Sequence, residues 1–179
     1  MIGVSKHLCG AATDLALRSL ASFSSSEKAA ATAGESPKSC NIQIVLIALC
    51  CHHRCDWSIF VGQDYLKQHE FKPEEFSLLC GLSSWATCGT GKPRKQKDFE
   101  KKDKAEAQNV HLDRYDRLDL SRDKREEIGR RVKRILDMAR CEFVKSSLKM
   151  PKVKLAYYVE SGYTLENVVL LAETEIDNS

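Results

Sequence analysis

The sequence IVLIALCCHHRCDW, from Ile44 to Trp57, places thiols, imidazoles and a guanidinium directly after an apolar run. A similar change occurs near the N-terminus, where the string SKHLCG follows the short apolar fragment IGV. Zinc prefers thiolate and imidazole ligands, while imidazole and amine groups are common acid–base catalysts. The two strings therefore allow three kinds of chemistry: metal binding, proton transfer and recognition of a charged ligand.

A zinc site in the second string depends on the path of its backbone. Successive side chains of a strand point to opposite faces, so Cys50 and Cys51 reach one ion only if the backbone turns between them. The chain has no Cys-x-x-Cys pair, and a fourth ligand would have to come from His7, Cys9 or Cys88. The spacing therefore predicts no metal site, and a zinc module is kept as an alternative.

The other residues of the second string favour a ligand-binding role. Cys50 is expected to be a small apolar side chain at the end of a buried strand, as free cysteines often are. His52, His53 and Arg54 must find polar partners or water where the strand ends. We therefore interpret these three residues as the mouth of a functional site.

Apolar periodicity indicates which elements position the two strings. Residues 2–4 predict the end of a strand, and the apolar spacing within residues 12–23 predicts an amphipathic helix. Residues 24–40 are small and polar and predict a flexible insertion. Residues 41–51 show no alternation of polar and apolar residues and contain a continuous apolar run from Ile44 to Cys51, typical of a strand that is covered on both faces of a parallel sheet. Because ligands bind outside the carboxyl ends of such strands, both strings should lie on one face of the molecule.

The second half of the chain predicts helices followed by a hairpin. Two helical segments are expected within residues 57–85, and residues 90–110 are a lysine-rich tract that predicts a flexible insertion. A long amphipathic helix follows Ser121, which is suited to cap it. Residues 153–160 and 167–173 predict two strands of an antiparallel hairpin. The pattern predicts one α/β domain whose mainly parallel sheet ends in an antiparallel hairpin.

Composition limits the class of protein without naming a partner. The chain has 179 residues, of which 42% are hydrophobic and 30% are charged, and its formal net charge is +3. It starts with no secretory signal pattern, and its longest apolar run is too short to cross a bilayer, so we expect an intracellular protein of the cytoplasm or nucleus with reduced thiols. The net charge is too small to establish a nucleic-acid partner, because clustering of basic residues matters more.

Three strings together resemble a known enzyme family. They are SKHLCGAATDLAL at residues 5–17, IALCCHHRCDW at residues 47–57 and SSWATCG at residues 83–89. They are similar to the eukaryotic tRNA ribose methyltransferases that methylate the 2'-hydroxyl of nucleotide four in the acceptor stem. The resemblance implies S-adenosylmethionine as cofactor, tRNA as partner, no membrane, and the class I, Rossmann-like methyltransferase fold.

In that family, zinc-binding elements and the first strands of the sheet, with the glycine-rich cofactor loop, precede the region that matches here. We therefore expect residues 1–179 to form a partial methyltransferase domain, the C-terminal catalytic part, which needs the preceding portion of the fold. The alternative is an inactive or RNA-associating fragment that lacks the cofactor loop.

The resemblance also implies roles for individual residues. The candidates for the base that accepts the ribose proton are Lys6, His7 and His53. Cofactor contacts are expected from Ser5, Cys9 and Gly10.

Substrate contacts are expected from both halves of the chain. The residues expected to hold tRNA are His52, Arg54, Arg130 and Arg134. The two arginines of the late helix share it with Glu126 and Glu127, and a mixed charged face is most often simply solvated.

Overall fold

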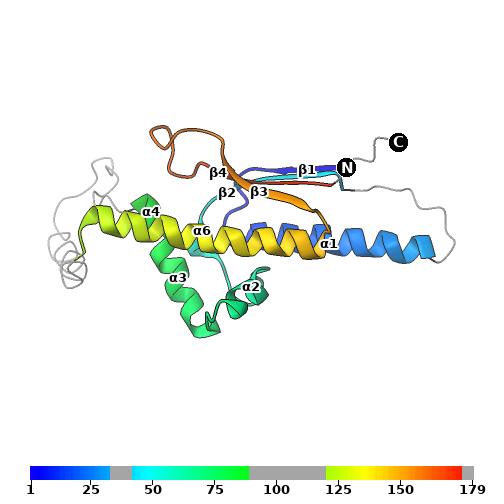
Figure 1. The fold of residues 1–179 in the computed structure, drawn as a ribbon, viewed down its shortest axis with the longest axis horizontal. Coiled ribbons are helices and arrows are strands. Elements are labelled where there is room, and N and C mark those ends of the chain that lie inside the picture. The colour runs from blue at the N-terminus through cyan, green and yellow to red at the C-terminus, as the bar shows by residue number, and fades with distance from the viewer. Residues whose placement is uncertain (33–41, 89–119, 175–179) are drawn as a thin grey trace, which may run out of the picture.

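A computed structural model describes residues 1–32, 42–88 and 120–174 as a sheet lying on two long helices (Figure 1). The four strands are β1 (Ile2–Ser5), β2 (Ile44–Leu49), β3 (Lys152–Tyr157) and β4 (Val168–Glu173). The two long helices are α1 (Ala11–Thr32) and α6 (Arg122–Ser147). The predicted order of strand, helix, strand, helices and closing hairpin is confirmed.

The strands lie in the order β1-β2-β4-β3. β1 pairs with β2 in parallel, whereas β4 is antiparallel to both β2 and β3. The predicted antiparallel hairpin is confirmed, but the prediction of a mainly parallel sheet is wrong for the described strands. The reason is that the hairpin inserts β4 between β2 and β3, so one strand makes two antiparallel ladders.

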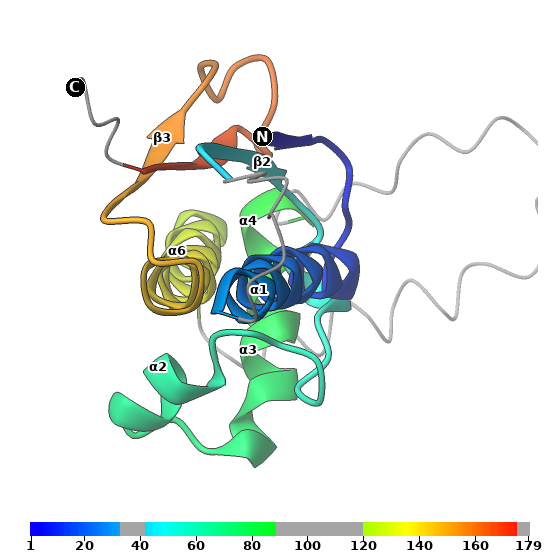
Figure 2. The ribbon, with the colours of Figure 1, turned by 90° about the vertical axis from the view of Figure 1, so that its right-hand side faces the viewer.

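The two long helices cover one face of the sheet, side by side (Figure 2). The main core joins the face of β2 that carries Val45, Ile47 and Leu49 to Leu17 of α1 and Val144 of α6. Burial alternates along β2, so its other face is only half covered. The prediction that β2 is covered on both faces is therefore wrong for the described residues, among which the helices lie on one side.

The open face of the sheet is apolar towards its β1 edge. Ile2 and Val4 are 58% and 67% exposed, and they pair with Ile44 and Leu46 of β2. These β-branched and leucine side chains explain why the run looked continuous in the sequence, although only one face is sealed in this structure.

Both long helices begin as the sequence indicates. The Ser121 hydroxyl accepts a hydrogen bond from the backbone N–H of Lys124, so Ser121 caps α6 as predicted. The helix predicted from residue 12 is α1, and it continues to Thr32, so it includes the first part of the insertion predicted at residues 24–40. Alanines are good helix formers and extend the helix there. Residues 33–41 and 89–119, which hold the rest of both predicted insertions, lie outside the described part.

The segment between β2 and α6 contains short helices. They are η1 (His52–Arg54), α2 (Gln63–Gln68), η2 (Pro73–Glu75), α3 (Phe76–Ser83) and α4 (Trp85–Cys88). Pro73 begins a helical turn, as predicted, because its fixed φ suits that position. These elements pack on α6 through a second apolar cluster that includes Phe60, Phe76 and Leu136. No described helix is long and apolar enough to cross a membrane.

Candidate functional site

The loops that follow β1 and β2 meet at one edge of the sheet. Parallel pairing aligns Ser5 with Ile47, so both strands end on the same side. The Gly10 N–H donates to the Cys50 carbonyl at 3.5 Å. A Cβ at Gly10 would come within 2.5 Å of the Arg54 carbonyl carbon and oxygen, so the two loops touch through their backbones. The prediction that the two polar strings share one face is confirmed.

The predicted base candidates are accessible. Lys6 and His7 are exposed on the first loop, and His53 and Arg54 are exposed on the second loop. His7 has a φ of 63°, which turns the chain sharply after β1. Their assignment as bases and phosphate ligand stays a prediction.

His52 occupies a different environment from its neighbours. His52 is 2% exposed, and its Nε2 lies 2.5 Å from Oδ1 of Asp137 on α6. Its Nδ1 is buried without a partner among the described residues. The structure thus places His52 inside the protein, where it positions the second loop against α6, and its predicted contact with substrate stays untested.

Sequence reasoning missed the buried charges behind this loop. The Arg140 guanidinium donates to both carboxylate oxygens of Asp14, at 2.8 and 3.1 Å, and its Nη1 lies 3.6 Å from Asp137. Burial disfavours the charge, but the carboxylate of Asp14 outweighs it and raises the pKa of Arg140, which stays protonated. The sequence signal for this buried pair was Asp14, an acidic residue on the apolar face of the first helix, four residues after the glycine of SKHLCG.

This cation also affects a thiol of the second loop. Arg140 Nη2 lies 3.1 Å from the Cys55 sulfur. Hydrogen bonding from Cys80, together with the charge of Arg140, lowers the pKa of Cys55 to about 7, against the effect of its burial. Cys55 is therefore partly a thiolate at neutral pH, which its sequence context did not indicate.

Three other thiols gather where the two loops touch. The sulfurs of Cys9, Cys50 and Cys51 lie within 4.8 Å of one another. The chain turns at Cys51, whose φ and ψ of 51° and 42° are left-handed. Adjacent cysteines can therefore point to one place, which meets the condition that the sequence argument had set against a metal site. Burial and the neighbouring thiols raise the pKa of Cys50 to about 12.

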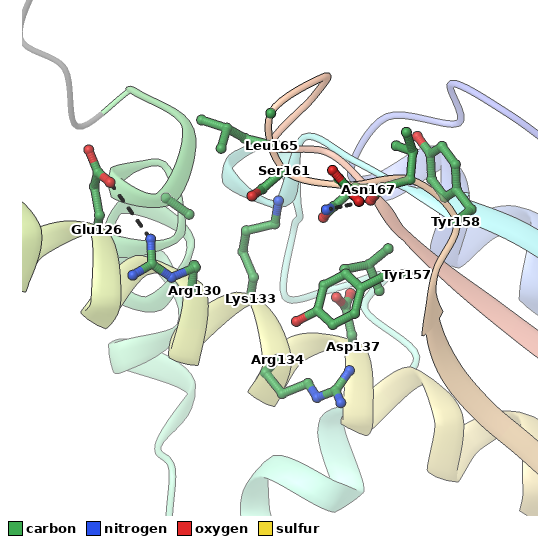
Figure 3. Close-up of a pocket in the computed structure, with 15 residues that line it drawn as sticks. Glu126, Arg130, Lys133, Arg134, Asp137, Tyr157, Tyr158, Ser161, Leu165 and Asn167 are labelled. Carbon is green, nitrogen blue, oxygen red and sulfur yellow. Dashed lines mark hydrogen bonds and ion pairs between the residues drawn. The ribbon is translucent and has the colours of Figure 1, made fainter.

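A large pocket opens beside this edge, between α6 and the connection from β3 to β4 (Figure 3). Its volume is about 920 Å³. Arg130 and Arg134 line the pocket and are exposed. Asp137, whose carboxylate holds His52, also lines the pocket but is buried. The pocket was not predicted, because its far wall comes from the connection between β3 and β4, which folds back over α6 only in the tertiary structure.

The pocket is lined by charges of both signs and by tyrosine rings, with Glu126, Asp137 and Glu160 beside Arg130, Lys133 and Arg134. Glu126 pairs with Arg130 at 3.7 Å, while Arg134 has no ion-pair partner among the described residues. Lys133 points from α6 towards the hairpin connection (Figure 3). It forms an ion pair with Glu166 of that connection. Tyr157 adds an aromatic ring that is 71% exposed.

Of the predicted cofactor contacts, Ser5 has an unused polar group. Its Oγ is buried and has no hydrogen-bond partner among the described residues. Cys9 lies in the thiol cluster, and the space beside Gly10 is filled by the Arg54 backbone. Only Ser5 thus offers a free hydrogen-bonding group at the carboxyl end of β1, and all three roles stay predictions.

The residues that form the fold and the site also match known proteins. The family model described as Methyltransferase TRM13 matches residues 1–173. The chain is 33% identical to the mouse tRNA:m(4)X modification enzyme TRM13 homolog, over 96% of this chain and 44% of that protein. It is 34% identical to the Scheffersomyces stipitis enzyme of the same name, over 98% of this chain and 37% of that protein, and 31% identical to the Saccharomyces cerevisiae enzyme, over 94% and 35%.

The chain thus spans less than half of the length of the relatives it matches. No solved structure matches it. The match to the family model covers the two loops, the pocket and every predicted site residue. The chain therefore belongs to the TRM13 methyltransferase family.

Proposed function

We propose that this chain supplies the substrate-facing part of an S-adenosylmethionine-dependent tRNA methyltransferase that methylates the 2'-hydroxyl of nucleotide four in the acceptor stem. The relatives are named as tRNA:m(4)X modification enzymes, and the chain spans less than half of each. An enzyme of this kind works where tRNA is made or used, in the nucleus or cytoplasm.

One observation carries the proposal. Asp137 lines the pocket that carries Arg130 and Arg134, and its carboxylate also holds His52 of the second loop at 2.5 Å. The pocket and the loops that carry Lys6 and His53 are therefore parts of one site rather than two separate surfaces. Such a site can hold a nucleic acid and present proton acceptors to it.

The sheet supports the finer assignment to a class I fold. β4 is antiparallel to both of its neighbours, so β2 and β3 run in the same direction as β1. Three strands that run one way, with a reversed strand inserted by the last hairpin, agree with the second half of a class I methyltransferase sheet. Ligands of open α/β sheets bind at the carboxyl ends of the strands, where both loops lie.

The fit to the cofactor rests on Ser5. Its buried, unpartnered Oγ at the end of β1 is a hydrogen-bonding group that a ligand at this edge would use. S-adenosylmethionine, when bound, supplies a methyl group on a sulfonium, which is a good leaving group. The task of the protein is then to hold the ribose oxygen in line with that methyl group.

The exposed loop residues provide the proton acceptor. The ribose oxygen loses its proton as its bond to the methyl carbon forms, and Lys6 or His53 accepts that proton in our assignment. His7 is a third candidate on the same loop as Lys6. Arg54, which is exposed beside His53, holds a phosphate of the tRNA.

The pocket fits an RNA duplex in its chemistry. Acceptor-stem duplexes present phosphates and 2'-hydroxyls along a shallow groove and are recognised mainly by shape and charge. Arg130 and Arg134 supply positive charge, and Tyr157 supplies an exposed ring for packing on a sugar or an end base.

The proposal is tested by methyl transfer from radiolabelled S-adenosylmethionine to tRNA. The 179-residue chain is assayed alone and as a chimera in which it replaces the matching region of the mouse relative. We expect 2'-O-methylation at nucleotide four by the chimera. If the chimera folds and binds tRNA but transfers no methyl group, the chain is an RNA-associating fragment and the proposal fails.

The base assignment needs its own variants in that chimera. Lys6→Ala together with His53→Ala should lower the rate of methyl transfer while tRNA affinity changes little. Lys149→Ala, which removes an exposed positive charge just after the C-cap of α6, is the control. Unchanged turnover in the double variant would exclude both residues as the base.

A further inference from the structure

The three thiols at the junction of the two loops form a second chemical centre. The sulfurs of Cys9, Cys50 and Cys51 converge within 4.8 Å, and those of Cys9 and Cys50 are 3.6 Å apart. Cys50 is buried, whereas Cys9 and Cys51 are partly exposed. The cluster is thus closed on the side of the core and open towards solvent.

The backbone is shaped to bring these sulfurs together. Cys51 is left-handed, a conformation that is uncommon for a residue other than glycine, asparagine or aspartate. This turn brings the Cys51 thiol to the same side as Cys50. Gly10, with a φ of 55°, lets the first loop approach Arg54 closely enough to deliver Cys9. The left-handed turns at Cys51 and Gly10 therefore both bring the three thiols together.

Neutral thiols do not explain this convergence. A thiol is a weak hydrogen-bond donor and a weak acceptor, so three of them gain little from one another. The Cys9 to Cys50 contact is far longer than a disulfide bond, which is about 2.05 Å, and all three cysteines are free thiols. A soft divalent cation, in contrast, binds several thiolates at once and replaces their protons.

We propose that Cys9, Cys50 and Cys51 bind one zinc ion as thiolates, with the release of three protons. No fourth cysteine, histidine or carboxylate atom joins the cluster within the described ranges 1–32, 42–88 and 120–174. Three protein ligands and one open position are the arrangement of zinc sites that take water or a small ligand. The ion also ties the first loop to the second loop at the edge where the site lies.

This inference is independent of the proposed function, because it requires no methyl transfer and no tRNA. It differs from the sequence prediction, which found no metal site because Cys50 and Cys51 were placed on opposite faces of a regular strand. The left-handed Cys51 removes that objection.

The test uses the whole 179-residue chain, purified with a reductant and freed of metal with a chelator. Cobalt is added as a coloured probe, and zinc then competes for the same site. We expect one equivalent of cobalt per chain, with thiolate-to-cobalt charge-transfer absorption, and its complete displacement by one equivalent of zinc. Zinc should also raise the melting temperature of the chain, since it binds only the folded state tightly.

Two variants decide whether the three thiols are the ligands. Cys51→Ala removes a partly exposed ligand and should weaken zinc binding by more than about 100-fold, since loss of a mere supporting residue costs about 10- to 100-fold. Cys9→Ala should do the same through the other loop. Cys141→Ala, a thiol outside the cluster, is the matched control and should leave zinc affinity unchanged.

The outcomes separate cleanly, because far-UV circular dichroism shows whether each variant is folded. If the reduced wild-type chain binds no stoichiometric metal, the inference is wrong. It is also wrong if folded Cys51→Ala and Cys9→Ala variants bind zinc as tightly as the wild type, which would move the site to other residues.

Discussion

Arg140 and Asp14 lie 126 positions apart in the chain, yet their side chains form a fully buried pair with two hydrogen bonds at 2.8 and 3.1 Å. The pair joins α6 to α1 directly beneath the two loops. Arg140 also contacts the Cys55 sulfur and the Gly10 carbonyl, so it touches both loops at once. The Arg140 side chain therefore connects both loops to the two long helices.

Removal of that cation should be strongly destabilising. Arg140→Met leaves the Asp14 carboxylate buried without its partner, and loss of one member of a buried ion pair costs about 3–5 kcal/mol. Urea denaturation of the wild type and the variant measures the free energy of unfolding. Arg131→Met, which breaks an exposed pair with Glu127, is the control and should cost about 1 kcal/mol or less. Equal losses in both variants would contradict the role given to Arg140.

Gly10 is the second point at which the loops depend on one residue. A Cβ at this position would lie 2.5 Å from the Arg54 backbone, and the positive φ of 55° is itself unfavourable for alanine. Gly10→Ala should therefore destabilise the fold by about 2–4 kcal/mol, from left-handed strain and overpacking.

Gly81→Ala provides the matched control for the measurement. Gly81 lies within α3, and a Cβ there meets no atom within 4 Å. Alanine in a helix is favoured over glycine by about 1 kcal/mol, so this variant should be slightly more stable than the wild type. If Gly10→Ala unfolds at the same urea concentration as the wild type, the close approach of the two loops is not required.

The elements could be predicted from the sequence because apolar periodicity is a local signal, and the meeting of the two loops because ligand-binding loops of an open α/β sheet follow the carboxyl ends of its strands. It did not allow the position of β4 or the pairing of His52 with Asp137 to be predicted, because those depend on contacts between distant segments. The convergence of Cys50 and Cys51 was missed for a different reason. A regular strand was assumed up to Cys51, whereas the strand ends at Leu49 and the chain turns there.

The thiol of Cys55 should make stability depend on pH in a defined direction. Its pKa is about 7 in the folded chain, because Cys80 and Arg140 favour the thiolate, against an ordinary value of 9.0. A group with a lowered pKa adds stability above its unfolded pKa and loses it as pH falls through its folded pKa. The contribution of Cys55 is therefore full above about pH 9, absent below about pH 7, and worth about 3 kcal/mol at most.

The measurement compares unfolding by urea at about pH 6 and about pH 9 in the wild type and Cys55→Ser. Cys50 acts in the opposite direction, since its pKa is raised to about 12, so only the difference between the two proteins isolates Cys55. The wild type should gain stability relative to Cys55→Ser as pH rises. A constant difference across this range would show that Cys55 does not ionise within the fold.

Arg134 allows the proposed contact of the pocket with RNA to be tested separately from catalysis. It lines the pocket and has no ion-pair partner among the described residues, whereas Arg131, three residues earlier on α6, is outside the pocket lining and pairs with Glu127 at 2.5 Å. If Arg134 contacts a phosphate, Arg134→Gln should weaken binding of an acceptor-stem duplex by about 1 kcal/mol, roughly fivefold, and lower the salt slope of log affinity by about 0.9. Fluorescence anisotropy across a range of salt concentrations measures both quantities. Arg131→Gln makes the same change of net charge and should alter affinity much less, so equal effects of the two variants would point to the overall charge of α6 rather than to the pocket.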